Sequence, residues 1–202
     1  AKNIQYYWTA ADCFYHFTTN FPVTKLADLK GKKIRALGVY GKYVQALGCS
    51  VAVVPGAEMY MAMKLGTIDG AIYGATGLMD VKLHEVVKYY THPTASQIAL
   101  SLAINKDALK KLPDDIRVIV EEGSRYVLDD TAMKYITMCK ASMAVAERLG
   151  STKRSNLPEE ELVKMRKLVA PIWDELAAKT PRMKKGVDIL KKQMRDLGRP
   201  LD

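Results

Sequence analysis

The sequence is short of cysteine and histidine and contains no long apolar run. Its 202 residues include only three cysteines and three histidines. The cysteines, Cys13, Cys49 and Cys139, lie far apart without a CxxC pair, which argues against a zinc site and allows at most one disulfide. No apolar stretch approaches the roughly 18 residues that cross a bilayer. The N-terminal residues lack the features of a signal peptide, but a mature chain would lack them too, so this absence does not locate the protein.

The few histidines also limit the enzymatic possibilities. Cys13 and His16 could form a nucleophile with its base, but residues three apart on a strand face opposite sides. His84 and His92 stand in no catalytic spacing and are expected to be structural. We therefore expect no catalytic residue, no metal site, no cofactor and no enzymatic activity, with a hydrolase kept as an alternative. Cys49 and Cys139 are expected in the core.

Positive charge is in excess, with 31 basic against 22 acidic residues and a formal net charge of +9. Such a balance suits nucleic acid, an acidic partner or an anionic small molecule. Several basic residues alternate with apolar ones at helical spacing near the C-terminus: Lys184, Lys185, Lys191, Lys192, Arg195 and Arg199. This pattern is typical of the solvated face of a helix. Since no zinc-finger spacing, RNA-binding signature or phosphate loop accompanies it, we expect no nucleic-acid partner. A basic nucleic-acid-binding or regulatory α/β domain stays a second alternative.

Strand and helix patterns alternate along the first half of the chain. Residues 4–19 are aromatic and β-rich, which predicts a strand and connecting segment. The expected elements that follow are a strand at 33–37, a helix at 40–47, a strand at 51–54, a helix at 58–65, a strand at 67–73, a helix near 78–88 and a strand at 97–105. This alternation indicates a sheet of mainly parallel strands built from βαβ units.

The second half of the sequence is helical. Pro113, Asp114 and Asp115 open a helix that the apolar periodicity extends to Leu149, about 35 residues and longer than usual in a globular domain. We expect this helix to cross between two lobes. Asn156 with Glu159 resembles a capping box at the start of a last helix, in which Pro171 should produce a kink.

Arg35 is the first candidate for a ligand-binding residue. It falls near the carboxyl end of the 33–37 strand, shortly before Gly38. Ligands of open α/β sheets collect outside the carboxyl ends of the strands. A guanidinium there offers a planar fork of donors suited to a carboxylate or phosphate. The alternative is a surface arginine that pairs with a neighbouring acid.

The motifs around Arg35 resemble those of one protein family. The segment Leu26–Arg35 (LADLKGKKIR) is similar to the turn and strand that precede the ligand-binding arginine in periplasmic solute-binding proteins of tripartite ATP-independent (TRAP) transporters. Further similar motifs follow in family order: TNFPV at 19–23, ALG at 46–48, VP at 54–55, EMY at 58–60, LGTIDG at 65–70, EVVKY at 85–89, IN at 104–105 and LP at 112–113. Each motif alone is too variable to identify a family, but their occurrence in the same order and at the family spacing is specific. The resemblance covers the chain from about residue 13 to its end.

This resemblance implies a fold and a domain organisation. The expected class is α/β, a type II periplasmic-binding-protein-like fold of two lobes with a long lobe-spanning helix and with the N-terminal part of lobe I missing. Residues 1–99 would form the main part of lobe II with a hinge strand. Residues 100–140 would return to lobe I, and residues 141–202 would complete lobe II with the C-terminal helices.

The resemblance also implies a function. The chain would be the extracytoplasmic subunit of a TRAP transporter, periplasmic after removal of a signal peptide. It would capture a small organic acid, either a monocarboxylate or a 2-oxo or 2-hydroxy acid, and deliver it to the membrane permease. Arg35 corresponds to the arginine that holds the ligand carboxylate.

Four other ligand-binding residues follow from the same resemblance. Tyr15 stands where acidic-sugar binders of the family can have a second arginine, and Tyr73 stands where asparagine or an aromatic residue is common. Both favour a less polar monocarboxylate, although packing with a satisfied hydroxyl is the alternative. The sequence from Gly38 resembles that of the 2-oxo acid binders. Gln97 occupies the place of a carboxylate that helps to hold a cation in those proteins, so a hydrogen bond to ligand oxygen is expected instead. Asp69 is expected to be structural.

Overall fold

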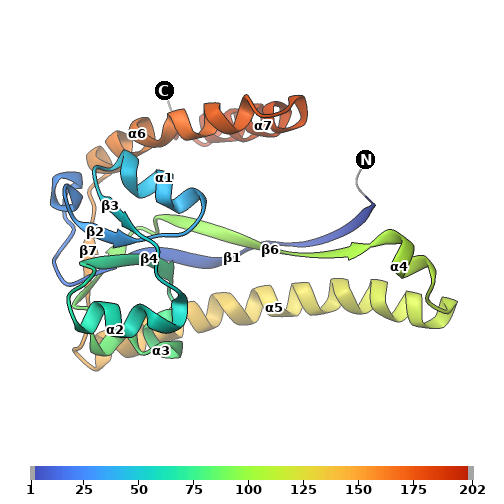
Figure 1. Cartoon of the computed structure of the whole chain (residues 1–202), viewed down its shortest axis with the longest axis horizontal. Coiled ribbons are helices and arrows are strands. Elements are labelled where there is room, and N and C mark those ends of the chain that lie inside the picture. Colours follow the sequence, from blue (N-terminus) through green and yellow to red (C-terminus); the bar gives the residue numbers. More distant parts are fainter. Residues whose placement is uncertain (1–2, 200–202) are drawn as a thin grey trace.

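The computed structural model describes residues 3–199, except for the side chains of residues 8–13, 99 and 100. The strands are β1 (Ile4–Thr19), β2 (Lys33–Arg35), β3 (Ser50–Ala52), β4 (Gly70–Gly74), β5 (Tyr89–His92), β6 (Ser96–Asn105) and β7 (Lys153–Asn156). The helices are α1 (Val39–Ala46), α2 (Met59–Lys64), α3 (Gly77–Asp80), α4 (Lys106–Lys110), α5 (Asp114–Arg148), α6 (Glu159–Ala177) and α7 (Pro181–Asp196), with 3-10 turns η1 (Leu26–Leu29), η2 (Gly56–Glu58) and η3 (Leu83–Glu85). Figure 1 shows their arrangement.

One mixed sheet organises the chain, in the order β3-β2-β4-β1-β5-β7. Strands β2, β3 and β4 are parallel to one another, as are β5 and β7. The end of β1, from Tyr15 to Thr19, runs antiparallel to β4, and its last two residues also pair with β5. The part of β1 from Ile4 to Tyr15 pairs antiparallel with β6. The predicted βαβ sheet with mainly parallel strands is therefore confirmed, with β1 as its antiparallel member.

Two apolar layers enclose this sheet, one on each face. The first contains Phe17, Leu29, Ile34, Val44 and Ile72 together with Met165, Val169 and Ile172 of α6. The second contains Met59, Met63, Ile68, Leu78, Leu83 and Val87 together with Ala146 of α5. Cys49 lies in the first layer, and Cys139 is buried beside Ala75, as predicted for core cysteines. The result is a helix–sheet–helix lobe, with α1 and α6 on one face and α2, α3 and the end of α5 on the other (Figure 1).

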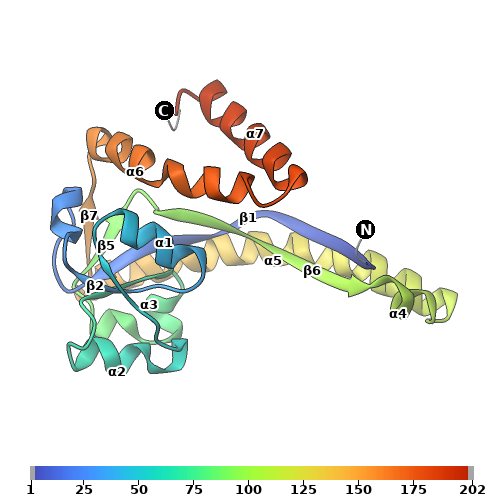
Figure 2. The same ribbon diagram turned by 45° about the horizontal axis from the view of Figure 1, so that its top comes forward.

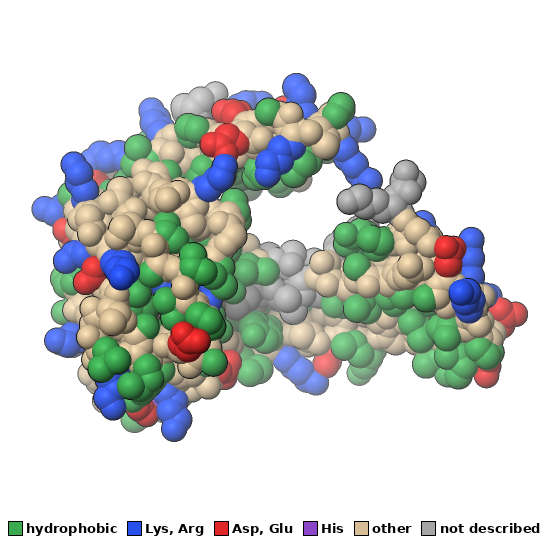
Figure 3. All heavy atoms as spheres, viewed as in Figure 1, with side chains coloured by type: hydrophobic (Ala, Val, Ile, Leu, Met, Phe, Trp, Pro, Cys, Tyr) green, Lys and Arg blue, Asp and Glu red, His purple; other side chains and the backbone are tan. Residues whose placement is uncertain are grey.

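A long arm extends from this lobe. It consists of the first half of β1, β6, α4 and most of α5, and it is seen in both ribbon views (Figures 1 and 2). The predicted helix from residue 113 to 149 is confirmed as α5, which has 35 residues. Many large apolar side chains of the arm are exposed: Tyr6, Leu102, Ile116, Val118, Ile119, Tyr126, Val127 and Met133. Figure 3 shows an open space between this arm and α7.

The helix predicted near residues 78–88 is wrong. The chain forms the short helix α3, then η3 and the strand β5, and Lys82 between the first two has a φ of 55°. Leu78 and Leu83 are both fully buried. Leu83 follows Leu78 by five positions, which places them about 140° apart around a straight helix, so one helix could not bury both on the same face.

The start of α6 also differs from the prediction. Pro158, not Asn156, precedes the helix as its N-cap, because Asn156 ends the strand β7 and follows the sheet geometry instead. Pro171 lies inside α6 as expected. Asn105 is the N-cap of the helix α4, and its side chain accepts hydrogen bonds from the amides of Asp107 and Ala108.

Candidate functional site

Arg35 is the last residue of β2, at the carboxyl end of a strand that lies between β3 and β4. This is the position predicted from the sequence. Its side chain is held in place from two sides. Nε donates to the carbonyl oxygen of Val54 at 2.9 Å, and the guanidinium lies 5.3 Å from the centre of the Tyr73 ring. The sheet thus fixes the direction of the guanidinium before any ligand arrives.

The surroundings of Arg35 are those of a buried cation. The residue is only 5% exposed, and none of the ion pairs among the described residues involves it. Burial lowers the pKa of Arg35, and the nearby Tyr73 and Tyr15 oppose this shift. A guanidinium remains charged at neutral pH even so. The alternative of a surface arginine paired with an acid therefore does not describe this residue, and a buried cation of this kind favours an anionic partner.

Tyr15 and Tyr73 lie near Arg35, and Tyr40 stacks on Tyr15; we call these three residues the tyrosine wall. The rings of Tyr15 and Tyr40 stack with centroids 5.3 Å apart and planes at 12°. Those of Tyr15 and Tyr73 are 6.2 Å apart. The hydroxyl of Tyr40 donates to Oγ of Ser96 at 3.0 Å and so connects α1 to the start of β6. The structure therefore brings Tyr15 and Tyr73 next to Arg35.

Tyr40 is a residue that sequence reasoning missed. Its only local signal is an aromatic side chain two positions after Gly38, and the stacking depends on α1 packing against β1. Gly38 precedes α1 with φ 56° and ψ −131°, a conformation that residues with a Cβ rarely adopt. In the structure, Gly38 therefore forms the turn that sets the direction of α1 and with it the position of Tyr40.

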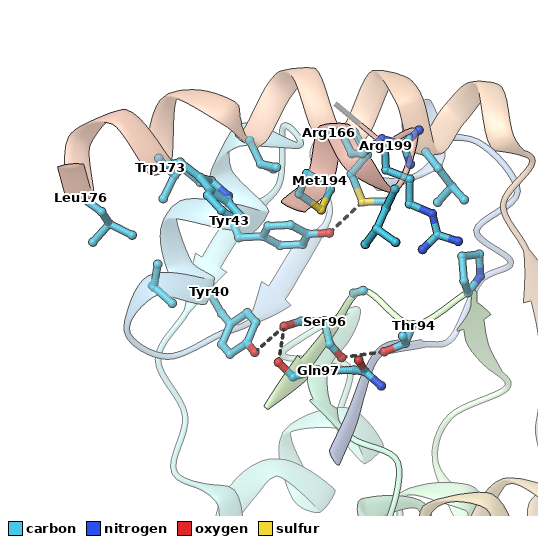
Figure 4. Close-up of a pocket in the computed structure, with 18 of the residues that line it drawn as sticks. Tyr40, Tyr43, Thr94, Ser96, Gln97, Arg166, Trp173, Leu176, Met194 and Arg199 are labelled. Atoms are coloured by element: carbon cyan, nitrogen blue, oxygen red, sulfur yellow. Dashed lines mark hydrogen bonds between the residues drawn. The ribbon is translucent and has the colours of Figure 1, made fainter. Parts of the chain in front are cut away.

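None of the described contacts joins Gln97 to Arg35. Gln97 sits at the start of β6, where it pairs with Phe14 of β1, and its side chain is exposed. It lines a cavity of about 660 Å³ between α1, the turn from β5 to β6, α6 and α7, which Arg35 does not line. Figure 4 shows Gln97 with Thr94 and Ser96 on one side of this cavity. The predicted grouping of Gln97 with Arg35 stays a prediction.

The other residues considered in the sequence, where the structure describes their side chains, contact backbone groups of the fold. The carboxylate of Asp69 accepts a hydrogen bond from the amide of Lys33 at 2.8 Å, which is the structural role expected of it. His84 contacts the carbonyl oxygen of Leu78 through Nδ1 at 2.6 Å. His16 is buried, with Nδ1 2.6 Å from the carbonyl oxygen of Thr91. The side chain of Cys13 lies outside the described residues.

The described part of the chain contains neither a metal-binding cluster nor a membrane-spanning helix. No group of three or more histidine, cysteine, aspartate or glutamate side chains there could hold a metal ion. None of the helices described is long and apolar enough to span a membrane.

Comparisons with known proteins agree on one family. The family described as bacterial extracellular solute-binding protein, family 7, matches residues 1–180. The C4-dicarboxylate-binding periplasmic protein DctP of Rhodobacter capsulatus is 25% identical over 166 residues, 81% of this chain and 50% of that protein. A monocarboxylate 2-oxoacid-binding periplasmic protein of Nostoc sp. is 26% identical over 165 residues, 80% of this chain and 45% of that protein. The chain thus spans about half the length of these curated relatives.

Solved structures share the fold. A TRAP periplasmic solute-binding protein from Chromohalobacter salexigens, with bound (S)-(+)-2-amino-1-propanol, matches with a TM-score of 0.81 and 22% identity over 99% of this chain and 64% of that one. Another from Rhodoferax ferrireducens, with bound malonate, matches with a TM-score of 0.78 and 22% identity over 96% of this chain and 63% of that one. The predicted fold class is confirmed by these likenesses.

Proposed function

Because the chain belongs to family 7 of the bacterial extracellular solute-binding proteins, we propose that it binds a small organic acid for a TRAP transporter. In this proposal the protein works in the periplasm, captures the acid and passes it to the membrane permease. It performs no covalent chemistry. Its relatives include periplasmic binding proteins for C4-dicarboxylates, for monocarboxylate 2-oxo acids and for sialic acid, all of which are organic acids, and this supports the proposal.

The observation that carries the proposal is the buried guanidinium of Arg35. Within the part of the chain that the structure describes, only its Nε forms a hydrogen bond with the protein, to the carbonyl oxygen of Val54. The amino groups of a guanidinium form a fork that matches the two oxygens of a carboxylate. An acid bound there would neutralise a cation that the fold has already removed from water, so binding requires little further desolvation of the protein.

The tyrosine wall supports a monocarboxylate, such as a 2-oxo or 2-hydroxy acid, as the ligand. Tyr15 and Tyr73 present ring faces and hydroxyls near Arg35, and neither can balance a second carboxylate. Ring faces pack well against short carbon chains. Ligands of the solved relatives vary, from malonate to galacturonate to mandelate, so the acid must be identified for this chain directly.

We also propose a division of the chain between two lobes. Residues 1–99 and 141–202 would belong to one lobe and residues 100–140 to the other. The packing supports this, because the end of α5 contacts α3 and β7, whereas its earlier part follows the arm away from the sheet. The acid would then bind between the lobe described here and a second one.

Thermal unfolding in the presence of different acids tests the proposal. Pyruvate or lactate at about 100 times its dissociation constant should stabilise the protein by about 2.7 kcal/mol, which corresponds to roughly 5–10 °C in melting temperature. Malonate and galacturonate should stabilise it less. Arg35→Gln should remove the effect, whereas Arg125→Gln, at an exposed position on α5, should keep it. Unchanged stabilisation of the Arg35→Gln variant by the acid would overturn the proposal.

A further inference from the structure

Arg35 does not line the cavity between α1, α6 and α7, although Tyr40 of the tyrosine wall does. Its volume of about 660 Å³ is within the range of sites that hold drug-sized ligands and exceeds what a three-carbon acid needs. Most of its lining is apolar: Val39, Tyr40, Tyr43, Leu162, Met165, Val169, Ile172, Trp173, Leu176, Met194 and Leu197. Polar groups are few, and they include two arginines, Arg166 and Arg199.

Arg166 is the most informative of these polar groups. Its side chain extends from α6 and is 19% exposed, and one of its amino groups, Nη2, donates to Oε1 of Glu159 at 2.7 Å. Its Nε is buried and has no hydrogen-bond partner among the described residues. Because Nε is fully covered, the donor that Arg166 offers to the cavity is its other amino group, Nη1, which has no hydrogen-bond partner among the described residues. Glu159 engages only Nη2, and it is the one acidic residue among the described residues that line the cavity.

The positive and apolar parts of the cavity are separated along its length. Figure 4 shows Arg166 and Arg199 toward one end and Trp173 and Leu176 toward the other, with Tyr43 between them. The hydroxyl of Tyr43 donates to the sulfur of Met165 at 2.7 Å. Burial raises the pKa of Tyr43, so its hydroxyl is neutral and adds no charge to the apolar part.

We propose that this cavity is a second binding site, for a monoanion with an extended apolar body, such as a carboxylate with a medium-length alkyl chain. The carboxylate accepts a hydrogen bond from Nη1 of Arg166, with Arg199 adding positive charge. The alkyl chain lies along Tyr43 toward Trp173. A sugar acid fits poorly, because its hydroxyls would face the apolar lining without partners.

Isothermal titration calorimetry of the 202-residue chain with a series of unbranched acids tests the proposal. Affinity should rise from butyrate through hexanoate to octanoate, by about threefold to fourfold for each methylene that becomes buried. Acetate, which lacks the chain, and 1-octanol, which lacks the charge, should both bind more weakly than octanoate. An affinity that does not depend on chain length, or equal binding of 1-octanol, overturns the proposal.

Two variants, one at each residue of the Arg166–Glu159 ion pair, distinguish a role of Arg166 in ligand binding from a purely structural role. Arg166→Gln should weaken octanoate binding at least about tenfold, because it removes the charged donor. Glu159→Gln should leave the affinity unchanged or raise it, because it releases Arg166 from a competing carboxylate. A merely structural ion pair would make both variants lose affinity together, and that result would overturn the proposal.

Arg35→Gln is the control for the location of the site. Octanoate should bind this variant as it binds the unchanged chain, since Arg35 does not line the cavity. Loss of octanoate binding in Arg35→Gln would show that the acid occupies the site beside Arg35 instead, and the second site would be rejected. This control also keeps the two proposals independent, because pyruvate binding depends on Arg35 and not on Arg166.

Discussion

Gly70 provides a sharp prediction about the sheet that positions Arg35. It begins β4 and pairs with Thr19 of β1 on one side and Ile34 of β2 on the other. A Cβ at this position would lie 2.7 Å from Cγ2 of Thr19, 2.8 Å from the carbonyl oxygen of Thr18 and 3.1 Å from Cδ1 of Ile34. Because one of these contacts is backbone, a side-chain rotation cannot relieve the clash, and Gly70→Ala must separate β4 from β1.

The expected cost is that of an overpacked core, about 1–3 kcal/mol. With a urea slope of about 2 kcal/mol per molar for a small domain, the unfolding midpoint should fall by roughly 0.5–1.5 M. Urea titration followed by far-ultraviolet circular dichroism measures this shift.

Gly123→Ala is the matched control for Gly70→Ala. Gly123 lies inside α5, and a Cβ there would meet nothing within 4 Å. Alanine should therefore stabilise the helix by about 0.5–1 kcal/mol and raise the midpoint. The two substitutions add the same methyl group and should have opposite signs. If Gly70→Ala left the midpoint unchanged, the close approach of β1 and β4 at this point would be refuted.

Three further predictions concern buried groups. Burial lowers the pKa of His16 below its ordinary value of 6.5. The unfolded chain therefore takes up a proton first, so stability should fall as the pH drops from about 6.5, and His16→Asn should flatten that part of a stability–pH curve. Tyr40→Phe and Ser96→Ala should show a coupling free energy of about 0.5–1.5 kcal/mol in a double-mutant cycle measured by urea unfolding, and additivity would contradict their hydrogen bond. Burial raises the pKa of the Cys49 thiol to about 11, so iodoacetamide at pH 8 should leave it unmodified in the folded protein, as peptide mass spectrometry can check.

The sequence predicts those helices and strands whose own residues show an apolar pattern or a recognisable start. The strand that ends at Arg35 has an alternating apolar pattern after a capped turn, and the side chain of Asp28 indeed accepts hydrogen bonds from the amides of Thr24 and Lys25 there. The long helix α5 follows from its proline start and its periodicity. By contrast, β7 was missed because only Ser155 among its four residues is buried, so no apolar alternation marks it. Its strand conformation comes from pairing with β5.

In the candidate site, too, features set by neighbouring residues in the sequence are predictable, whereas features set by long-range packing are not. The position of Arg35 at a strand end is a local property, and it was predicted. The tyrosine wall is not local, because Tyr15, Tyr40 and Tyr73 come from β1, α1 and β4 and meet only when the sheet and its covering helix assemble. The cavity beside Arg166 depends on α6 and α7 lying across α1, and no pattern within those helices specifies that arrangement.

The exposed apolar residues of the arm bear on how the acid site would work. Ile119 is 65% exposed, Tyr126 72% and Val127 57%, although all three are of types that normally help to form a core or an interface. Their helix, α5, is the one whose far end anchors in the lobe that carries Arg35. A second lobe packed on this face would be joined to the first by α5, β1 and β6, and rotation about these connections could bring it over the acid. The arm and the buried cation therefore support the same proposal, in which closure of a second lobe excludes water from the carboxylate beside Arg35 and strengthens its hydrogen bonds.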